Sequence, residues 1–474
     1  MNSLQLSPGD FRRLAEKTTA LAADYLEAID QRPCFPATTG AEVARLFAQP
    51  LPEEGLGAAA FDSFGDVLSH SRIQNGRFFG YVLGSGEPVA ALGDLLASVL
   101  NQNVTAWRSG PAAVTIERTV VDWLARAIGC AGFTGSLCGG GSAANLMGLA
   151  MAREARAPAN ARGAQPGVVY VSEEVHMSIG KAVALLGLGQ DNVRTIPTDD
   201  GFRMMAAKLE AAIAEDYAAG RKPIAVVASA GTVNTGAIDP LAEIGEVAGR
   251  YGLWFHVDGA YGALAALAAP QRFAGMARAD SISLDAHKWL YQPLDCGCLL
   301  YRDAAAARTA FSRSGEYARS LSDDPVEGFS FFEESLELSR RFRALKLWLS
   351  LRYHGLAAFR RAIARNLGHA QALAEKIRGQ RQLELLAPVE LSVVCFRLVG
   401  KKGARAASEE ELDGWNAAIL KRVLERGRVY ISNARLRGKF ALRACIVNHR
   451  TTEADLDAVV EEVLAAAREV RSHA

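Results

Sequence analysis

The sequence predicts an α/β protein built on a mainly parallel sheet with helices on both faces. Between residues 143 and 301, short β-branched or apolar runs alternate with Ala-rich stretches of helical periodicity. This alternation is typical of βαβ units, whose parallel strands are buried on both faces. The chain has 474 residues, half of them hydrophobic, so it can bury a large core. The expected strands are 168–172, 193–196, 224–228, 253–257, 281–284 and 298–301.

Three regions follow one another along the chain. Residues 8–30 carry an apolar stripe at helical spacing and prolines then interrupt the chain, so we expect residues 1–87 to form an N-terminal helical arm for dimerisation. Residues 88–345 are expected to form the large domain that holds the sheet and the ligand site. Residues 346–474 are expected to form a smaller C-terminal α/β domain, with strands at 391–398, 429–432 and 440–447 and a final helix at 452–470.

Composition excludes several kinds of partner. Lys plus Arg number 53 and Asp plus Glu number 52, and the basic runs are short, so no nucleic-acid partner is expected. No apolar stretch reaches the roughly 18 residues that span a membrane, and the first residues lack the pattern of a signal peptide. The seven cysteines include no Cys-x-x-Cys pair, which is typical of reduced thiols in the cytoplasm. No metal site is expected, because His256 and His287 lack further ligands at metal spacing.

Two charged side chains lie just past the ends of expected strands, where ligands bind in parallel sheets. Lys288 follows one strand beside His287 and Trp289, and a partly desolvated lysine has a free amine for Schiff-base chemistry. A surface lysine is the alternative. Asp258 ends another strand before small residues, so it can pair with a cationic ring nitrogen while a flat ligand approaches. Capping of the next helix is the alternative for this acid.

Three further polar segments lie next to expected elements. The glycines at 139–141 precede Ser142 and a helix, and their exposed N–H groups suit a phosphate, although the segment has no Walker or Gly-x-Gly-x-x-Gly spacing. His176 can stack on a flat ring or transfer protons, and Thr232 offers a hydroxyl. Ordinary turns and a structural histidine are the alternatives. Together with the lysine and the acid, this set suits a phosphorylated pyridine aldehyde.

Two continuous segments carry a resemblance to a known family. They are His256-Val257-Asp258-x-Ala260-Tyr261 and Asp285-Ala286-His287-Lys288-Trp289, with support from residues 339–346 and 394–397. Their order resembles the pyridoxal-phosphate-dependent group II decarboxylases, the family of aromatic L-amino-acid decarboxylases, over nearly the whole chain. The resemblance implies fold type I of pyridoxal-phosphate enzymes, an obligate homodimer, and decarboxylation of an L-amino acid to its amine.

The resemblance also implies a role for each candidate residue. Lys288 is implied as the Schiff-base lysine, Asp258 as the partner of the pyridine nitrogen, and His176 as the imidazole stacked on the ring opposite Ala260. The residues implied to lie beside the phosphate and the ring hydroxyl are Gly141, Ser142, Asp285, His287 and Thr232. Many members have Asn where this chain has Asp285, and a carboxylate beside a phosphate is unfavourable unless it is protonated or faces away.

A proton donor and a substrate class follow from the same resemblance. Tyr317 lies where the family places a loop tyrosine that protonates the carbon after carbon dioxide leaves, and a surface tyrosine is the alternative. An aromatic wall, partly lent by the partner subunit, favours Tyr, Phe, dihydroxyphenylalanine or Trp as substrate, and core packing is its alternative. The residues implied to contact the substrate are Phe79, Tyr81, Trp107 and Ser339.

Other functions remain open at this point. One is oxidative deamination to an arylacetaldehyde, whose enzymes replace the loop tyrosine or the stacking histidine, whereas both Tyr317 and His176 are present here. Another is decarboxylation of a non-aromatic amino acid. An aminotransferase, a lyase of the same fold or a non-catalytic binding protein is disfavoured by the Ala-His-Lys-Trp context and by the presence of Lys288.

Overall fold

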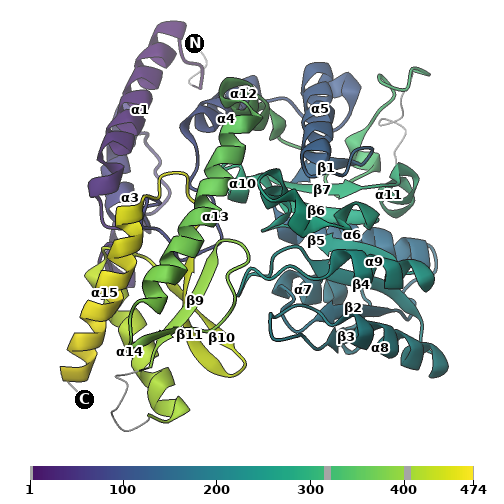
Figure 1. Ribbon diagram of the computed structural model, residues 1–474. Coiled ribbons are helices and arrows are strands. Elements are labelled where there is room, and N and C mark those ends of the chain that lie inside the picture. The colour runs from purple at the N-terminus through teal and green to yellow at the C-terminus, as the bar shows by residue number, and fades with distance from the viewer. Residues whose placement is uncertain (1–3, 314–321, 400–406, 473–474) are drawn as a thin grey trace.

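A seven-stranded sheet lies at the centre of the larger part of the molecule (Figure 1). The computed structural model describes residues 4–313, 322–399 and 407–472. The strand order is β1-β7-β6-β5-β4-β2-β3, in which β7 pairs antiparallel with β1 and β6 and the other pairs are parallel. The prediction of a mainly parallel sheet is confirmed. The strands are β1 (Thr134–Cys138), β2 (Val168–Ser172), β3 (Val193–Ile196), β4 (Pro223–Ser229), β5 (Trp254–Asp258), β6 (Ser281–Asp285) and β7 (Gly297–Tyr301).

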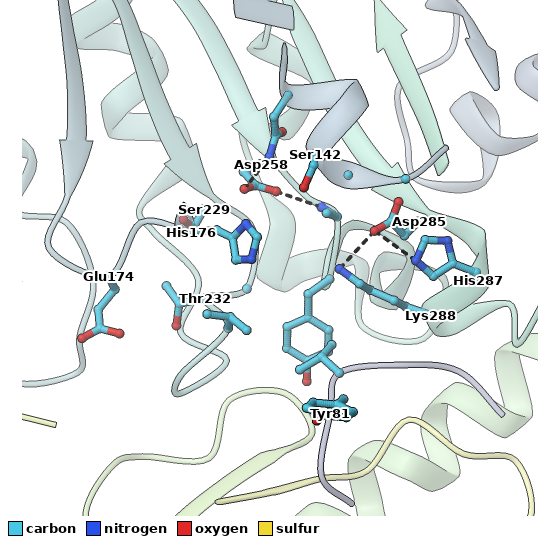
Figure 2. A pocket seen from close by; sticks show the side chains of 18 of the residues that line it. Tyr81, Ser142, Glu174, His176, Ser229, Thr232, Asp258, Asp285, His287 and Lys288 are labelled. Carbon is cyan, nitrogen blue, oxygen red and sulfur yellow. Dashed lines mark hydrogen bonds and ion pairs between the residues drawn. The ribbon is translucent and has the colours of Figure 1, made fainter. Parts of the chain in front are cut away.

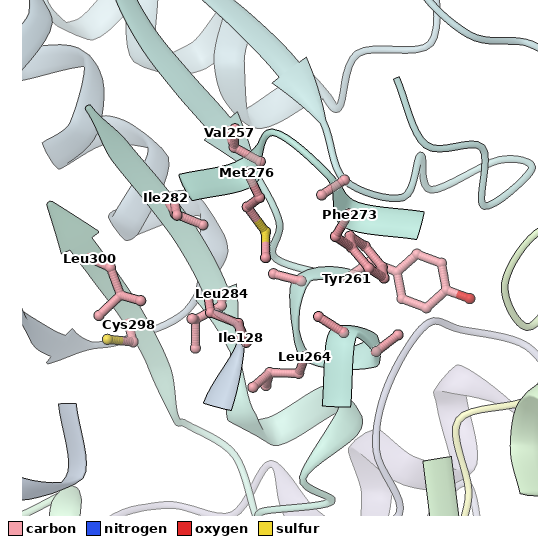
Figure 3. Close-up of a cluster of buried hydrophobic side chains, with 14 of the residues drawn as sticks. Ile128, Val257, Tyr261, Leu264, Phe273, Met276, Ile282, Leu284, Cys298 and Leu300 are labelled. Atoms are coloured by element: carbon pink, nitrogen blue, oxygen red, sulfur yellow. The ribbon is translucent and has the colours of Figure 1, made fainter. Parts of the chain in front are cut away.

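Helices cover both faces of this sheet, because successive residues of each strand point to opposite sides. On β2, for example, Tyr170 belongs to one core and its neighbours Val169 and Val171 to the other. Figure 3 shows part of the first core, where Ile282 and Leu284 of β6 lie among apolar side chains from the segment that precedes this strand, including Leu264 and Met276. The first face is covered by α5 (Pro111–Ala127), α8 (Ala206–Ala218) and α9 (Leu241–Arg250), and the second by α6 (Gly141–Arg156), α7 (Met177–Leu185) and α11 (Ala304–Phe311).

A second, antiparallel sheet has the order β10-β11-β9-β8 and packs against three helices. The expected strand at 429–432 is wrong, because β10 begins only at Ser432. The preceding residues are extended but pair elsewhere: the Phe79 N–H donates to the Tyr430 carbonyl at 2.7 Å. The elements are β8 (Leu383–Leu385), β9 (Val393–Leu398), β10 (Ser432–Leu436), β11 (Lys439–Cys445), α13 (Leu356–Arg378), α14 (Glu409–Arg426) and α15 (Glu453–Ser472).

The N-terminal region has little core of its own, as the sequence predicts. Helix α1 (Pro8–Ala28) contains no buried residue and lies at the edge of the molecule, far from the seven-stranded sheet (Figure 1). Short helices α2 (Gly40–Phe47) and α3 (Phe64–Ser69) follow. Helix α4 (Pro88–Leu100) then packs closely on α12 (Ala344–His354). The division of the chain at residues 87 and 345 stays a prediction.

The apolar residues of the helices can be compared with what a protein contact and a membrane span require. The outer face of α4 exposes Leu92, Leu95, Leu96, Val99 and Leu100, each by more than 40%. None of the described helices is long and apolar enough to cross a membrane. An exposed face of this kind on a surface helix is typical of a contact with another protein surface.

Candidate active site

The carboxyl ends of several strands of the large sheet open into one cavity of about 380 Å³ (Figure 2). Because β2, β4, β5 and β6 are parallel, the residues that follow them meet at the same edge of the sheet. The structure therefore brings together every residue that the sequence predicts for the cofactor. These are Gly141, Ser142, His176, Thr232, Asp258, Ala260, Asp285, His287 and Lys288.

Lys288 lies in the four-residue helix α10 (Ala286–Trp289), which begins directly after β6. The fully buried indole of Trp289 anchors this turn by stacking on Tyr261, with the ring centroids 5.8 Å apart. The Lys288 Nζ lies 3.0 Å from Oδ2 of Asp285, and the lysine side chain is 20% exposed. The amine is therefore held at the cavity wall and stays accessible from the cavity.

Asp258 ends β5 and is buried, yet its carboxylate is well supplied with donors. Its Oδ2 accepts a hydrogen bond from Nδ2 of Asn145 at 2.9 Å. Its Oδ1 accepts from the Ser283 hydroxyl and from the Ala260 N–H, both at 3.2 Å. Donors of this kind offset the loss of hydration that a buried carboxylate suffers. The acid is thus held facing the cavity, where it can pair with a cationic ligand atom.

The loop before α6 forms a cradle with room for an anion. Gly140 has a φ of +125°, which L side chains rarely adopt, and a Cβ on Gly141 would come within 2.6 Å of the Ala260 Cβ. The N-terminus of α6 begins at this loop, so its free backbone N–H groups and the positive end of the helix dipole face the same space. The residues present therefore fit a phosphate group.

Asp285 places a second carboxylate in this corner of the cavity. It is 2% exposed, and its Oδ2 lies 3.4 Å from Nε2 of His287 as well as close to Lys288. Its Oδ1 is buried and has no hydrogen-bond partner within the described part of the chain. Burial lowers the pKa of His287, whose Nδ1 accepts from the Cys296 N–H at 3.3 Å. A buried acceptor without a donor is uncommon, so this corner of the cavity is incompletely bonded before a ligand binds.

His176 and Tyr81 complete the cavity from two other sides. His176 is the N-cap of α7, where its Nδ1 accepts from the Ser178 N–H, so the ring has a structural contact and also lines the cavity. Burial lowers the pKa of His176 and therefore favours the neutral ring. Tyr81 lies at the mouth of the cavity together with Leu294, and both are more than half exposed. Thr232 also lines the cavity, and its hydroxyl lies 2.9 Å from the Thr235 hydroxyl.

Three residues predicted to contact the substrate lie outside this cavity lining. Phe79 is fully buried in the core of the smaller sheet, and Trp107 packs against the core of the larger one. Ser339 is exposed on the surface of the chain. Tyr317 lies outside the described residues. The contacts of these four residues with a substrate stay predictions.

Asn145 and Arg443 are among the cavity residues that reasoning from the sequence missed. Asn145 lies one helical turn after Ser142 on α6, so the helical period could have identified it. Arg443 comes from β11 of the smaller sheet, and its guanidinium donates to the Val233 carbonyl at 2.9 Å. No local pattern connects β11 with this edge of the large sheet, so Arg443 could not have been found in the same way.

An accessible lysine, a well-bonded acid and an anion cradle in one cavity are typical of enzymes that bind pyridoxal phosphate. The conserved domain of pyridoxal-dependent decarboxylases matches residues 68–399. An aromatic-L-amino-acid decarboxylase of Bacillus atrophaeus is 34% identical over 475 residues, covering 99% of this chain and 98% of that protein. A phenylacetaldehyde synthase of Petunia hybrida is 32% identical, covering 93% and 91%. The solved structure of Oryza sativa TDC with PLP and tryptamine has a TM-score of 0.91 at 28% identity, covering 98% of this chain and 99% of that one.

The chain therefore belongs to the pyridoxal-dependent decarboxylase family. The predicted fold, cofactor and enzyme class are confirmed: the protein is a decarboxylase of amino acids that depends on pyridoxal phosphate. When bound, pyridoxal phosphate supplies an electron sink for the charge left on carbon as carbon dioxide departs.

Proposed function

We propose that this protein converts an aromatic L-amino acid to the corresponding amine and carbon dioxide. The observation that carries the proposal is the shared cavity of Lys288, Asp258 and His176, which offers an amine, a fixed acid and a neutral imidazole to one ligand. Two relatives support the substrate class, since one is named for aromatic L-amino acids and one for phenylacetaldehyde.

Each side chain has a separate task in this proposal. Lys288 holds the cofactor covalently, and Asp258 pairs with the pyridine nitrogen and keeps it cationic. The cradle at Gly141 and Ser142, with Asp285 and His287 beside it, binds the phosphate. With the cofactor bound, His176 and Ala260 would contact its ring from opposite sides, and Thr232 would offer a hydroxyl beside the ring. The support for this assignment is that all of these residues line the same cavity.

The mouth of the cavity favours a flat apolar side chain. Tyr81 and Leu294 lie there and are more than half exposed, and the buried Val82 and Tyr261 also line the cavity. Exposed aromatic and aliphatic groups at a cavity mouth gain free energy when an aromatic ring covers them. Trp107 and Ser339 are proposed to contact this substrate ring only where a partner subunit completes the pocket.

The direct test is an assay of carbon dioxide and amine release. We expect L-tyrosine, L-phenylalanine, dihydroxyphenylalanine or L-tryptophan to be turned over at least tenfold faster than L-glutamate at equal concentration. A Lys288→Ala variant is the control for release that does not depend on the site. Faster turnover of L-glutamate or another acidic amino acid would show that the substrate class is wrong.

A second candidate function is oxidative conversion to an arylacetaldehyde, which the similarity to the Petunia hybrida synthase favours. The proposed proton donor Tyr317 distinguishes the two, because a carbanion that is not protonated can react with oxygen instead. We expect the wild type to make amine and Tyr317→Phe to lose most of it, with peroxide and aldehyde appearing. If the wild type itself makes aldehyde and peroxide, the second function is correct.

We further propose that the protein acts as a cytoplasmic homodimer in which a second copy covers the exposed face of α4 and the arm around α1. The support is the row of exposed leucines on α4 and the lack of buried residues in α1. The seven free, buried cysteines fit a reducing compartment. Light scattering should give twice the chain mass, and Leu96→Glu should give the mass of one chain with loss of activity. A fully active single chain would contradict the proposal.

A further inference from the structure

A chain of hydrogen bonds runs through the buried interior from the start of β5 to its end. The Trp254 Nε1–H donates to Oγ of Ser281 at 2.8 Å, and this Oγ lies 2.8 Å from Nδ1 of His256. His256 Nε2 lies 2.9 Å from Oδ1 of Asn145. Asn145 Nδ2 then donates to Oδ2 of Asp258 at 2.9 Å. Five side chains on three elements are thus joined behind the wall of the cavity.

The direction of every bond in this chain is set by its two ends. An indole N–H can only donate, and an ionised carboxylate can only accept. Ser281 therefore accepts from Trp254 and has its own hydrogen for His256 Nδ1. Burial lowers the pKa of His256 to about 4, so the ring is neutral and its one hydrogen lies on Nε2, facing Asn145. Turning the Asn145 amide over would place its oxygen against the carboxylate of Asp258.

The close packing of α6 on His256 fits this chain of hydrogen bonds. His256 is fully buried, and Gly148 of α6 lies so close that a Cβ there would come within 2.7 Å of the imidazole. Only a residue without a side chain lets α6 approach the ring so closely. The same approach brings Asn145, one helical turn earlier on α6, between His256 and Asp258.

The chain of hydrogen bonds branches at Asn145. Its amide NH₂ has two hydrogens, and the second is donated to Oγ of Ser178 at 2.9 Å. Ser178 therefore accepts from Asn145 and points its own hydrogen at Nδ1 of His176, which lies 2.8 Å away. The backbone N–H of Ser178 reaches the same nitrogen at 3.3 Å. With two donors aimed at Nδ1, neutral His176 carries its hydrogen on Nε2.

We propose that Asn145 is a positioning residue that governs both working groups of the cavity. It keeps Asp258 a hydrogen-bond acceptor, and through Ser178 it holds His176 in the tautomer with hydrogen on Nε2. His176 then offers a bound substrate a hydrogen-bond donor and not a base. This inference rests on the proposed function for its meaning in catalysis, but the tautomer itself is independent of which substrate is used.

The first test observes the tautomer directly. The cofactor-loaded protein is labelled with ¹⁵N-histidine, and the His176 signal is identified by its loss in His176→Asn. We expect one hydrogen, on Nε2, and no protonation of Nδ1 between pH 6.5 and 8.5. A hydrogen on Nδ1, or a doubly protonated ring at pH 7.5, would overturn the proposal even if the protein decarboxylates aromatic amino acids as proposed.

The second test uses three variants to separate the two arms of the hydrogen-bond network. One arm runs from Asn145 to Asp258, and the other runs from Asn145 through Ser178 to His176. Asn145→Ala removes a donor from both arms, Ser283→Ala removes a donor from Asp258 only, and Ser178→Ala removes a donor from His176 only. Loss of one hydrogen bond to a charged group should weaken cofactor binding about tenfold in Asn145→Ala and Ser283→Ala.

The His176 signal should move toward a mixture of tautomers in Asn145→Ala and Ser178→Ala, and stay unchanged in Ser283→Ala. If Asn145→Ala does not fold, the contrast between Ser178→Ala and Ser283→Ala carries the test. An unchanged His176 signal in Ser178→Ala, or an equal change in Ser283→Ala, would show that the branch through Asn145 does not govern the ring.

Discussion

The cavity has two acidic corners, and their carboxylates are partnered in opposite ways. Asp258 accepts hydrogen bonds from Asn145, Ser283 and the Ala260 backbone. Asp285 is also buried, but one of its oxygens has no partner among the described residues and the other lies beside Lys288 and His287. The donors around Asp258 are part of the folded chain, whereas Asp285 faces the cradle that receives a ligand.

The comparison shows that one edge of the sheet carries two kinds of carboxylate: one is already hydrogen-bonded within the protein, and the other lies beside the lysine. A carboxylate with its donors already in place, such as Asp258, keeps its position before any ligand arrives. A carboxylate that depends on a movable lysine changes its surroundings when that lysine forms a new bond. We therefore expect substitutions in the two corners to act in different ways, and four experiments test this.

The largest effect is expected for Lys288, the cation beside Asp285. Lys288→Ala removes the only side chain proposed to bond the cofactor covalently, so activity should fall by about 10⁴-fold or more. Borohydride reduction of the wild type followed by peptide mapping should label Lys288. Lys346 is a good internal control, since its amine is buried against Asp94 at 2.9 Å. A label on Lys346 or Lys181 would contradict the assignment.

The next effect is expected at Asp258. Asp258→Asn keeps the shape of the side chain but removes the negative charge that pairs with a cationic ring, so turnover should fall by roughly 10³-fold. Steady-state rates and cofactor affinity measure this. Asp285→Asn makes the same change of shape and charge in the other corner and is the matched control. Equal losses in both variants would mean that the two corners do not differ.

A smaller effect is expected on the free energy of unfolding at acidic pH. It comes from His256, which is joined to Asp258 through Asn145. The pKa of buried His256 is lowered to about 4, so between about pH 6.5 and 4 the unfolded chain binds a proton there and the folded chain does not. The free energy of unfolding should therefore drop as the pH falls, by about 2 kcal/mol from this group at pH 5.

Urea unfolding at pH 7.5 and pH 5, at one protein concentration, measures this loss. His256→Asn should show a pH dependence weaker by that amount, because the titrating ring is gone. A variant with the same pH dependence as the wild type would show that His256 binds its proton in the folded state too.

The smallest effect is expected from Asp285→Asn. Replacing a buried negative charge beside the anion cradle with an amide should tighten binding of pyridoxal phosphate about tenfold, because repulsion between two anions is removed. Titration of the cofactor-free protein, followed by its tryptophan fluorescence, gives the affinity. Pyridoxal without phosphate is the control ligand and should gain nothing. Weaker binding of the phosphorylated ligand would show that Asp285 is a needed contact.

Much of the fold and of the candidate site could be predicted from the sequence alone. Strand runs of apolar residues predicted β2, β3, β4, β5 and β6 to within a residue or two, because buried parallel strands have a simple local pattern. Asp258, Lys288 and His176 each follow such a strand. Parallel strands end at one edge of their sheet, so local pattern was enough to predict that these three residues meet.

Tertiary structure alone decided the contacts that depend on elements far apart in the chain. Tyr81 lines the cavity while Phe79, two residues earlier, is buried in the core of the smaller sheet, and the Phe79 N–H donates to the Tyr430 carbonyl, far along the chain. Arg443 enters the cavity from β11, a strand of the other sheet. The partners of Asp258 and Asp285 were decided in the same way, since burial and hydrogen bonding depend on which helices pack behind each strand, and a linear pattern does not contain that information.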